Sequence, residues 1–399
     1  MRILLVHQNF PGQFRDIAPK LCDLGHELKA ISCSQRQTDG RIEVLRYDYA
    51  QPVRQGIHAL SAEVDEWIRR GELVGKLAEG LRRRGWAPDV MLAHPGWGEA
   101  MLLKQIFPAT PLVIWPELWL QPEHMGVNST SMTVEQAQYL RVKNWLVDGA
   151  MADASLAILP TAYQAGSFPE RWQNKLEIIP EGIPDHLFSM PRLSQLTISP
   201  SVTLGTENKV VSFISRNLEP MRGFPTFMRA IPDLQKRMPE LEVVIVGGDG
   251  LSYSSAPGEG KTWKQVMLEE LQENLDLSRV HFLGRIPHQE LIKLYRRSDL
   301  HLYLSNAFVL SWSLLEVMAC GTPVLTADNP MMREINSQVP GNKVWNATSQ
   351  SLSTAILEAI NSKGTDKTAS SQHLYQTHSL SKTVNCLAKC LEMVTTGRF

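Results

Sequence analysis

Two arginines, Arg216 and Arg222, lie on one short segment between a predicted strand and a predicted helix that begins near Phe224. Guanidinium groups bind phosphate oxygens through paired hydrogen bonds, and the N-terminus of a helix adds positive potential. Either arginine by itself is more often a solvated surface residue. Two of them on one loop after a strand indicate a clamp for a diphosphate.

Glu316 is a second candidate, because it lies early in a predicted helix that follows the loop Val309–Ser311. A carboxylate there can accept two hydrogen bonds from a vicinal diol such as ribose, and the N–H groups of the loop can face a phosphate. A structural interpretation also stands. Ser313 and Glu316 have the spacing of a capping box, which only closes the N-terminus of the helix.

Two loops in the first half of the chain are further candidates. Gly12 lies between a predicted strand and a predicted helix, where a glycine lets backbone N–H groups approach an anion. A simple tight turn explains Gly12 equally well. His94 ends another predicted strand, so its side chain is expected to point into a ligand cleft. The alternative for His94 is a structural role, with its ring hydrogen-bonded to a neighbouring loop.

The elements that position these residues follow from two alternating apolar patterns. Short continuous apolar runs are typical of parallel strands buried on both faces, and they occur at 3–6, 28–33, 42–45, 90–93, 112–115, 156–159, 176–179, 210–214, 241–246, 280–283, 300–304 and 323–326. Helical patterns occur at 14–24, 57–84, 97–106, 133–149, 161–167, 224–237, 261–275, 288–297, 312–320 and 381–395. This alternation predicts an α/β fold with parallel sheets.

A polar segment at about 190–208, rich in proline, serine and threonine, separates two sets of strands and has the composition of a linker. We therefore expect two doubly wound domains, over 1–195 and 205–380. The last helix, within 381–399, is expected to pack back on the first domain. Two facing α/β domains bind ligands in a central cleft, at the carboxyl ends of their strands.

Composition excludes several classes of function. The 399 residues are 43% apolar and 20% charged, with 40 Lys and Arg against 41 Asp and Glu, so the chain lacks the basic excess that nucleic-acid binding needs. Its five cysteines are scattered without metal-ligand spacing, which favours a reducing compartment. No apolar run reaches the ~18 residues of a membrane span. A cytoplasmic protein is expected.

The motifs, taken in order, resemble the retaining glycosyltransferases of family 4, which have the GT-B fold. The resemblance covers nearly the full length. It rests on the Gly12 loop, Ala93-His94 before a Gly-Trp pair, 178–183, Ser215-Arg216 with Arg222-Gly223, 244–248, 282–287, and 315–324 with its spacing to Glu334.

The resemblance implies a role for each candidate residue. Arg216 and Arg222 would grip the diphosphate of a nucleotide-sugar donor, and Glu316 would hold its ribose hydroxyls. Ile286 would pack against the base. The Gly12 loop would approach the phosphates and the donor sugar, and His94 would lie near the reacting centre.

One position departs from the family. A glutamate that contacts donor-sugar hydroxyls is usual eight positions before Glu316, where this chain has Phe308. An aromatic ring cannot replace the carboxylate as a hydrogen-bond acceptor, so the candidates to do so are backbone groups of Val309 and Leu310, or Asn306 nearby. Phe308 also supports an alternative function, that of a non-catalytic nucleotide-sugar-binding or scaffolding relative.

The implied reaction is retaining transfer of a hexosyl group from a UDP- or GDP-sugar to a hydroxyl of a glycan, glycolipid or small molecule, in cell-surface polysaccharide or glycolipid synthesis. In this class the departing phosphate can take the acceptor's proton, so neither a metal nor another cofactor is expected. The sequence contains no Asp-x-Asp, the metal-binding signature of the other large glycosyltransferase fold.

Two further signals have competing interpretations. An arginine-rich stretch within 57–84 could rest on the anionic inner face of a membrane or could simply be a solvated helix face. Gly258–Thr262 resembles the end of a phosphate-binding P-loop, but no predicted strand immediately precedes it, so an ordinary loop is favoured.

Overall fold

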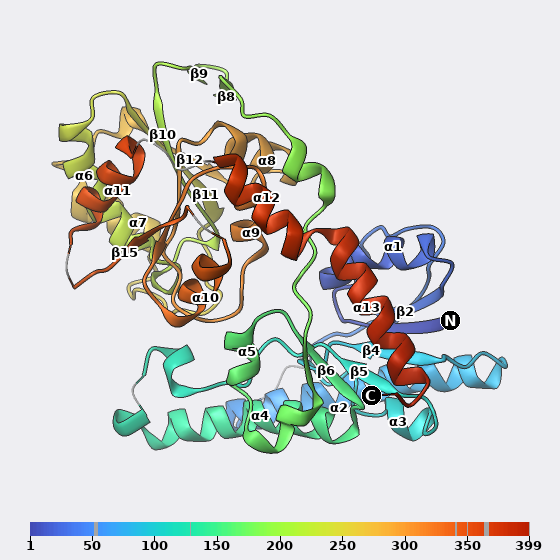
Figure 1. Cartoon of the computed structure of the whole chain (residues 1–399). Coiled ribbons are helices and arrows are strands. Elements are labelled where there is room, and N and C mark those ends of the chain that lie inside the picture. The colour runs from blue at the N-terminus through green and yellow to red at the C-terminus, as the bar shows by residue number, and fades with distance from the viewer. Residues whose placement is uncertain (52–54, 128, 340, 349, 363–366, 399) are drawn as a thin grey trace. The chain divides into compact units, whose positions relative to one another are not determined.

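The computed structural model describes residues 1–51, 55–127, 129–339, 341–348, 350–362 and 367–398. The chain folds as two compact units, which are unit 1 (Met1–Gly182 with His378–Phe399) and unit 2 (Ile183–Thr377). Each contains a parallel sheet with helices on both faces (Figure 1). The predicted α/β fold with two Rossmann-like halves is therefore confirmed.

The sheet of unit 1 has the order β3-β2-β1-β4-β5-β6-β7. Its strands are β1 (Arg2–Val6), β2 (Glu27–Ser32), β3 (Glu43–Arg46), β4 (Val90–Ala93), β5 (Leu112–Ile114), β6 (Leu156–Leu159) and β7 (Leu176–Ile178). Its helices are α1 (Ile17–Asp23), α2 (Ala59–Arg83), α3 (Leu103–Ile106), α4 (Val134–Asp153), α5 (Ala162–Gly166) and α13 (Leu380–Thr395).

The strands of unit 1 are continuously apolar because both faces of the sheet are buried. In β1, Ile3 and Leu5 belong to the core under α1 and α13, whereas Leu4 and Val6 belong to the core under α2 and α4. The helix α13 comes from the far end of the chain and packs against α1 and β4. It closes one face of the sheet (Figure 1).

The sheet of unit 2 has the order β12-β11-β10-β13-β14-β15. Its strands are β10 (Lys209–Asn217), β11 (Leu241–Gly248), β12 (Val280–Gly284), β13 (Leu300–Tyr303), β14 (Val324–Ala327) and β15 (Lys343–Trp345), and a separate hairpin pairs β8 (Leu196–Ser199) with β9 (Val202–Leu204). Its helices are α6 (Phe224–Arg237), α7 (Trp263–Leu271), α8 (His288–Arg297), α9 (Trp312–Ala319), α10 (Pro330–Gln338), α11 (Leu352–Asn361) and α12 (Lys367–His378).

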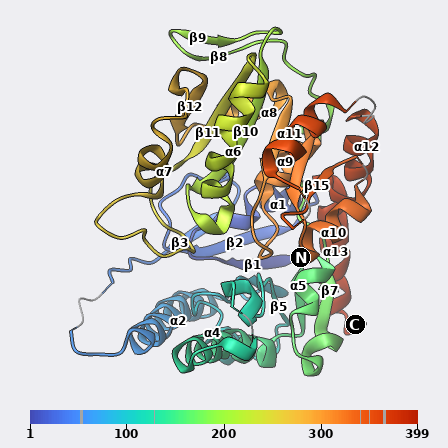
Figure 2. The same cartoon turned by 90° about the vertical axis from the view of Figure 1, so that its left-hand side faces the viewer.

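Helices of unit 2 cover both faces of its sheet. Residues of α6, α7 and α11 share one hydrophobic core with the strands, and Figure 2 shows α6 and α7 in front of the sheet. On the other face, α8 contacts β10 and α9. The helices α6 and α8 have the bounds that the sequence predicts, since their apolar periodicity is strong.

The predicted linker at 190–208 is wrong as a description of this segment. The hairpin β8–β9 occupies its middle part, with Leu196 and Leu204 buried, and β8 packs against α8 (Figure 2). Arg192 donates hydrogen bonds to the Tyr295 carbonyl at 3.0 Å and to Thr322 Oγ1 at 2.5 Å. The division between the units instead falls at Gly182 and Ile183.

Other differences concern short or weakly patterned elements. The helix predicted at 97–106 is formed only as α3, because turns occupy its first residues. Four elements after β14, namely α10, β15, α11 and α12, were not predicted. The strand β15 has only three residues, and α11 depends on packing of Leu352, Ala355, Ile356 and Ala359 into the core of unit 2.

Candidate functional site

In unit 1 the candidate residues lie where the strand order reverses. β2 and β3 lie on one side of β1, and β4 with the later strands lies on the other. Open α/β sheets bind ligands at the carboxyl edge of such a switch point, because the loops there diverge. His7 follows β1 and His94 follows β4, and their ring centroids lie 5.2 Å apart. The ring of His94 also stacks on Trp97, with centroids 4.2 Å apart.

Gly12 lies against this histidine pair. It begins a 3₁₀ turn, Gly12–Phe14, and has a φ of 44°, in the left-handed region. A Cβ at this position would lie 2.5 Å from Cε1 of His7. Glycine is therefore required both by the backbone conformation and by the close approach of the loop to the His7 ring.

Backbone N–H groups determine which nitrogen of each histidine carries the proton. The N–H of Asn9 donates to Nδ1 of His7 at 2.9 Å, and the N–H of Gly96 donates to Nδ1 of His94 at 3.0 Å. In the neutral rings the proton therefore lies on Nε2. Burial, together with the charge of His94, lowers the pKa of His7 to about 3, which keeps that ring neutral.

His94 is therefore arranged as a hydrogen-bond donor. Its Nε2 is buried, has no hydrogen-bond partner within the described residues, and lies 3.8 Å from Oε1 of Glu117. An N–H in this position can donate to an oxygen of a bound ligand. It cannot accept a proton while the ring is neutral.

A buried carboxyl group close to His94 was missed by the sequence analysis. Glu99 is fully buried, and its Oε1 accepts a hydrogen bond from the hydroxyl of Tyr47 at 3.0 Å. Burial raises the pKa of this carboxyl group. Arg70 lies nearby, with its guanidinium 3.9 Å from the centroid of Tyr49. The available signal was the position of Glu99 in the post-strand loop of His94.

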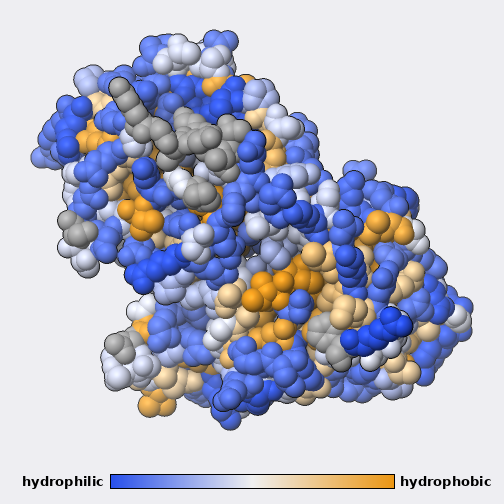
Figure 3. Space-filling model, in the orientation of Figure 1, coloured by the Kyte–Doolittle hydropathy of each residue, from blue (hydrophilic) through white to orange (hydrophobic). Residues whose placement is uncertain are grey.

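The arginine-rich helix α2 compensates much of its own positive charge. Arg69 forms an ion pair with Asp65 at 2.6 Å, and Arg83 forms one with Glu79 at 2.7 Å. These pairs favour the solvated-face interpretation over a lipid-binding one. The face drawn in Figure 3 is hydrophilic over most of its area, with one apolar patch near the middle of the view. Among the helices of the described residues, none has the length and apolar character that crossing a bilayer requires.

In unit 2 the reversal of strand order lies between β10 and β13. Three segments lie at the carboxyl ends of strands at this switch point: the arginine loop (residues 216–223), which includes the last two residues of β10, the tyrosine loop (residues 249–255) after β11, and the phenylalanine loop (residues 304–311) after β13. Two helices, α6 and α9, begin immediately after the first and third loops.

The two predicted arginines lie at opposite ends of the arginine loop. Arg216 is exposed and lies inside β10, next to its last residue, whereas the sequence predicted it in the loop after the strand. Its side chain has no hydrogen-bond partner within the part of the chain that the structure describes. Arg222 ends a 3₁₀ turn, and its Nη1 donates to Oγ of Ser305 at 3.3 Å. Gly223, with a φ of 80°, brings this loop so close to Leu304 that a Cβ would lie 2.4 Å from Cβ of Leu304.

A buried carboxylate, which the sequence analysis missed, joins the arginine loop to the tyrosine loop. Oε2 of Glu219 accepts three backbone hydrogen bonds, each of 3.0 Å, from Ser252, Tyr253 and Ser254. The N–H of Met221 in turn donates to Oγ of Ser254 at 3.0 Å. Glu219 is fully buried, so these bonds are protected from water.

Phe308 lies beside Tyr253. The two ring centroids are 5.1 Å apart with a tilt of 57°, and the guanidinium of Arg222 lies 5.0 Å from the Tyr253 ring. Of the next two predicted residues, Val309 is half-buried and Leu310 is buried. Tyr253 carried no recognisable sequence signal, because its loop has no regular pattern.

Glu316 is buried, and its Oε1 accepts a hydrogen bond from Nε2 of His288 at 2.8 Å. The helix α9 begins at Trp312 with Ser311 as its N-cap, so Glu316 lies in the second turn. The capping-box interpretation is therefore wrong, because Ser313 is inside the helix. Ile286 is half-buried and lies two residues before His288, the first residue of α8.

The P-loop resemblance at Gly258–Thr262 has an ordinary structural explanation. The segment belongs to the long connection between β11 and α7. Lys261 donates to Glu269 at 2.8 Å and lies 3.5 Å from Glu259. Its charge is thus paired on the protein surface.

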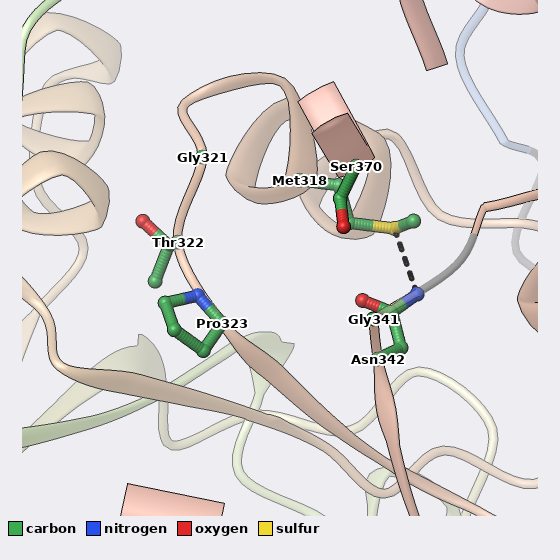
Figure 4. A pocket seen from close by; sticks show the side chains of 7 residues that line it. All are labelled: Met318, Gly321, Thr322, Pro323, Gly341, Asn342 and Ser370. Carbon is green, nitrogen blue, oxygen red and sulfur yellow. Dashed lines mark hydrogen bonds between the residues drawn. The ribbon is translucent and has the colours of Figure 1, made fainter. Parts of the chain in front are cut away.

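A small cavity of unit 2 does not match any predicted site (Figure 4). Its volume is about 20 Å³, which is room for a water molecule and not for a nucleotide or a sugar. Asn342 and Met318 face each other across it, with Nδ2 and Sδ 3.9 Å apart (Figure 4). Across the described residues of both units, no group of three or more His, Cys, Asp or Glu side chains is arranged to hold a metal ion.

The predicted residues thus form two groups, one in each unit. In unit 1, Gly12 and His94 meet at His7. In unit 2, Arg222 and Phe308 meet at Tyr253, while Arg216 is exposed at the start of the arginine loop. Glu316 is hydrogen-bonded to His288, which lies two residues after the predicted Ile286.

Comparison with known proteins identifies both halves of the chain. Residues 24–188 match the glycosyl transferase family 4 group, and residues 197–373 match the glycosyl transferases group 1. Among curated proteins, the D-inositol 3-phosphate glycosyltransferase of Corynebacterium jeikeium is 28% identical over 222 residues, which are 53% of this chain and 51% of the relative. The phosphatidyl-myo-inositol mannosyltransferase of Propionibacterium freudenreichii is 28% identical over 183 residues, or 46% and 39% of the two chains. The chain thus spans about half the length, or less, of these curated relatives.

Solved structures share the fold over the whole chain. Anabaena Alr3699/HepE in complex with UDP and glucose has a TM-score of 0.66 at 21% identity, and the match covers 98% of this chain and 99% of that one. Sucrose-phosphate synthase from Thermosynechococcus elongatus has a TM-score of 0.72 at 14% identity, with 100% of both chains covered. At these identities the likeness establishes the fold. The chain therefore belongs to the group 1 glycosyl transferases of family 4 and has their GT-B fold.

Proposed function

We propose that this protein is a retaining glycosyltransferase that moves a hexosyl group from a UDP- or GDP-sugar to an acceptor hydroxyl, without a resident metal ion. The observation that carries the proposal is the switch point of unit 2. There the arginine loop contains the buried Glu219 and leads into the N-terminus of α6, and α9 begins directly after the phenylalanine loop. This combination is suited to a nucleotide diphosphate.

In the proposed complex, Arg216 and Arg222 bind the diphosphate and stabilise the charge that develops on it as it departs. Groups already oriented toward a developing charge lower the barrier, since they need no reorganisation during the reaction. Glu316 accepts hydrogen bonds from the ribose hydroxyls, and its bond from His288 holds the carboxylate in place. Ile286 and the neighbouring backbone pack against the base.

The proposed chemical step balances without an additional base. The bond between the hexosyl C1 and the phosphate oxygen breaks, and the acceptor oxygen bonds to C1 on the same face. The acceptor's proton passes to an oxygen of the departing phosphate. His94, whose proton lies on Nε2, donates a hydrogen bond to a donor-sugar oxygen, and the Gly12 loop supplies backbone N–H groups.

Several observations support the donor, acceptor and setting. The related fold of Alr3699/HepE was solved with UDP and with UDP-glucose, and the curated relatives are named for transfer to inositol compounds. We place the acceptor among the glycans, glycolipids or small molecules of cell-surface synthesis. All five cysteines are free thiols, which suits a reducing cytoplasm.

The test begins with donor binding. Thermal denaturation is measured with UDP-, GDP- and ADP-hexoses, each with magnesium and with a chelator. A ligand at a hundredfold its Kd adds ~2.7 kcal/mol of stability, so one nucleotide family should raise the Tm equally in both conditions. Release of hexose from that donor, without acceptor, then reports activity.

Variants assign the site. Arg216→Ala and Glu316→Ala should reduce donor turnover by about 10²-fold or more, while Arg237→Ala, at an exposed arginine of unit 2, should not. Absence of a shift with every nucleotide-sugar would overturn the proposal. Binding without any hexose release or transfer would instead identify a nucleotide-sugar-binding relative.

A further inference from the structure

Two aromatic rings from different loops lie side by side at the switch point of unit 2. Tyr253 belongs to the tyrosine loop and Phe308 to the phenylalanine loop, and their centroids are 5.1 Å apart. Tyr253 is 45% exposed, which is unusual for a large ring that is held by neighbouring contacts. The pair therefore presents an apolar surface to solvent at a position where sheets of this kind bind ligands.

The position of Tyr253 is fixed by buried interactions. The carboxylate of Glu219 accepts the N–H of Tyr253 and of the residues before and after it. In addition, Nδ2 of Asn217 donates to Oγ of Ser252 at 2.7 Å. A fully buried carboxylate that bonds three successive N–H groups holds this short segment in one conformation. The ring is thus held in place by the arginine loop.

Arg222 links the ring pair to the phosphate-binding function. Its guanidinium lies 5.0 Å from the Tyr253 ring and also donates to Ser305, which is close to Phe308 in the chain. In a nucleotide-sugar the terminal phosphate is bonded directly to C1 of the hexose. A group next to the arginine that binds this phosphate is therefore next to the sugar.

From this geometry we infer that Tyr253 and Phe308 form an aromatic wall against which the hexosyl ring of the donor lies. The inference rests on the proposed function. A pyranose presents C–H groups on its faces, and these pack on aromatic rings. A hydroxyl that points at the rings loses its hydrogen bonds to water and gains none. The wall therefore determines specificity. It favours a hexose whose hydroxyls are equatorial, so that only C–H groups face the rings, over an epimer with an axial hydroxyl that points at them.

The experiment compares the affinity for a UDP- or GDP-hexose with that for the corresponding nucleoside diphosphate, by isothermal titration. Phe308→Ala is the primary variant, because it leaves the contact between Arg222 and the Tyr253 ring in place. We expect Phe308→Ala and Tyr253→Ala to weaken binding of the nucleotide-sugar by about tenfold. Phe308→Ala should change the Kd of the nucleoside diphosphate by less than about twofold. Tyr253→Phe, which keeps the ring, should bind the sugar more tightly than Tyr253→Ala.

Leu251→Ala is the matched control, since Leu251 is 46% exposed on the same loop and should leave both affinities unchanged. Discrimination between epimeric donors should also fall in Phe308→Ala. Equal loss of affinity for the sugar donor and the diphosphate, or no loss of either, would overturn the aromatic wall alone. Failure of the unmodified protein to bind any nucleotide or nucleotide-sugar would overturn the proposed function and the wall with it.

Discussion

At the scale of single residues, the N–H groups of Asn9 and Gly96 determine what the histidines of unit 1 can do. Each occupies Nδ1 of one ring, so each neutral ring keeps its proton on Nε2. A histidine arranged in this way polarises or orients an oxygen and does not remove a proton. This agrees with a reaction in which the departing phosphate takes the acceptor's proton.

The donor role of His94 can be tested by substitution. His94→Ala should lower kcat by about 10²-fold, because one oriented hydrogen-bond donor is lost. His94→Gln, whose amide can also donate, should retain more activity than His94→Ala. The measurement is steady-state turnover with the donor found to bind. His58→Ala, at an exposed histidine of unit 1, is the control, and equal activity of all variants would contradict the role.

At the scale of elements, loops of unit 2 are held together by close backbone approach and by one carboxylate. Gly223 allows the arginine loop to touch Leu304, and Glu219 joins it to the tyrosine loop. The arginines are thus carried on a loop whose conformation is fixed from both sides. The helix α13 also depends on residues far away in the sequence, because it packs against α1 and β4 of unit 1.

Gly223→Ala should both destabilise unit 2 and weaken donor binding. The left-handed conformation costs a non-glycine residue roughly 1–2 kcal/mol, and the new Cβ would overlap Leu304. The control is Gly85→Ala in unit 1, which has a φ of 78° but nothing within 4 Å of the added Cβ. Urea unfolding and donor titration should show a lost stability in both variants and a lost affinity only in Gly223→Ala. Normal affinity in Gly223→Ala would contradict the loop's role.

Leu387→Ala tests the contribution of α13. Leu387 is fully buried in the core of unit 1, so its truncation should lower the free energy of unfolding by about 2–5 kcal/mol. Met393→Ala, at a 43% exposed position of the same helix, should cost much less. Denaturant unfolding is followed by tryptophan fluorescence, to which the buried Trp115 of unit 1 contributes with the other tryptophans of both units. Similar midpoints for both variants would show that α13 adds little to the core.

At the scale of the whole molecule, several histidines are buried in neutral form. Burial lowers the pKa of His301 to about 3 and that of His378 to about 4. The ordinary value in the unfolded chain is about 6.5. Below that pH the unfolded chain therefore binds protons that the folded chain does not. Their contribution to stability is complete above pH ~6.5 and is lost progressively as the pH falls toward the folded-state values.

His301→Gln should reduce this acid sensitivity. Each such histidine contributes a slope of up to roughly 1.4 kcal/mol per pH unit, so stability should fall less steeply between pH 6 and 4.5 in His301→Gln, whatever its stability at neutral pH. The measurement is the free energy of unfolding at several pH values across that range. His186→Gln, at an exposed histidine of unit 2, should keep the original slope. Parallel curves for His301→Gln and the unmodified protein would contradict the assignment.

The amino-acid sequence by itself determined the α/β class and most of the strands and helices. Buried parallel strands must be apolar on both faces, and amphipathic helices such as α6 and α8 repeat their apolar residues every turn, so both patterns are visible locally. Residue type and position after a strand also pointed to His94, Arg222 and Glu316. The hydrogen-bond donors and acceptors of a guanidinium or a carboxylate follow from the residue type, so they are known before the neighbouring residues are.

Tertiary structure alone decided which side chains meet. The contacts of Tyr253 with Phe308, of His288 with Glu316 and of Glu219 with the tyrosine loop join residues far apart in the chain. The hairpin β8–β9 likewise looked like a linker, because its burial depends on α8. Apolar periodicity indicates only which face of its own helix or strand a residue occupies. Partners across loops are determined by the order and register of the strands, which bring the ends of distant segments to one edge of a sheet.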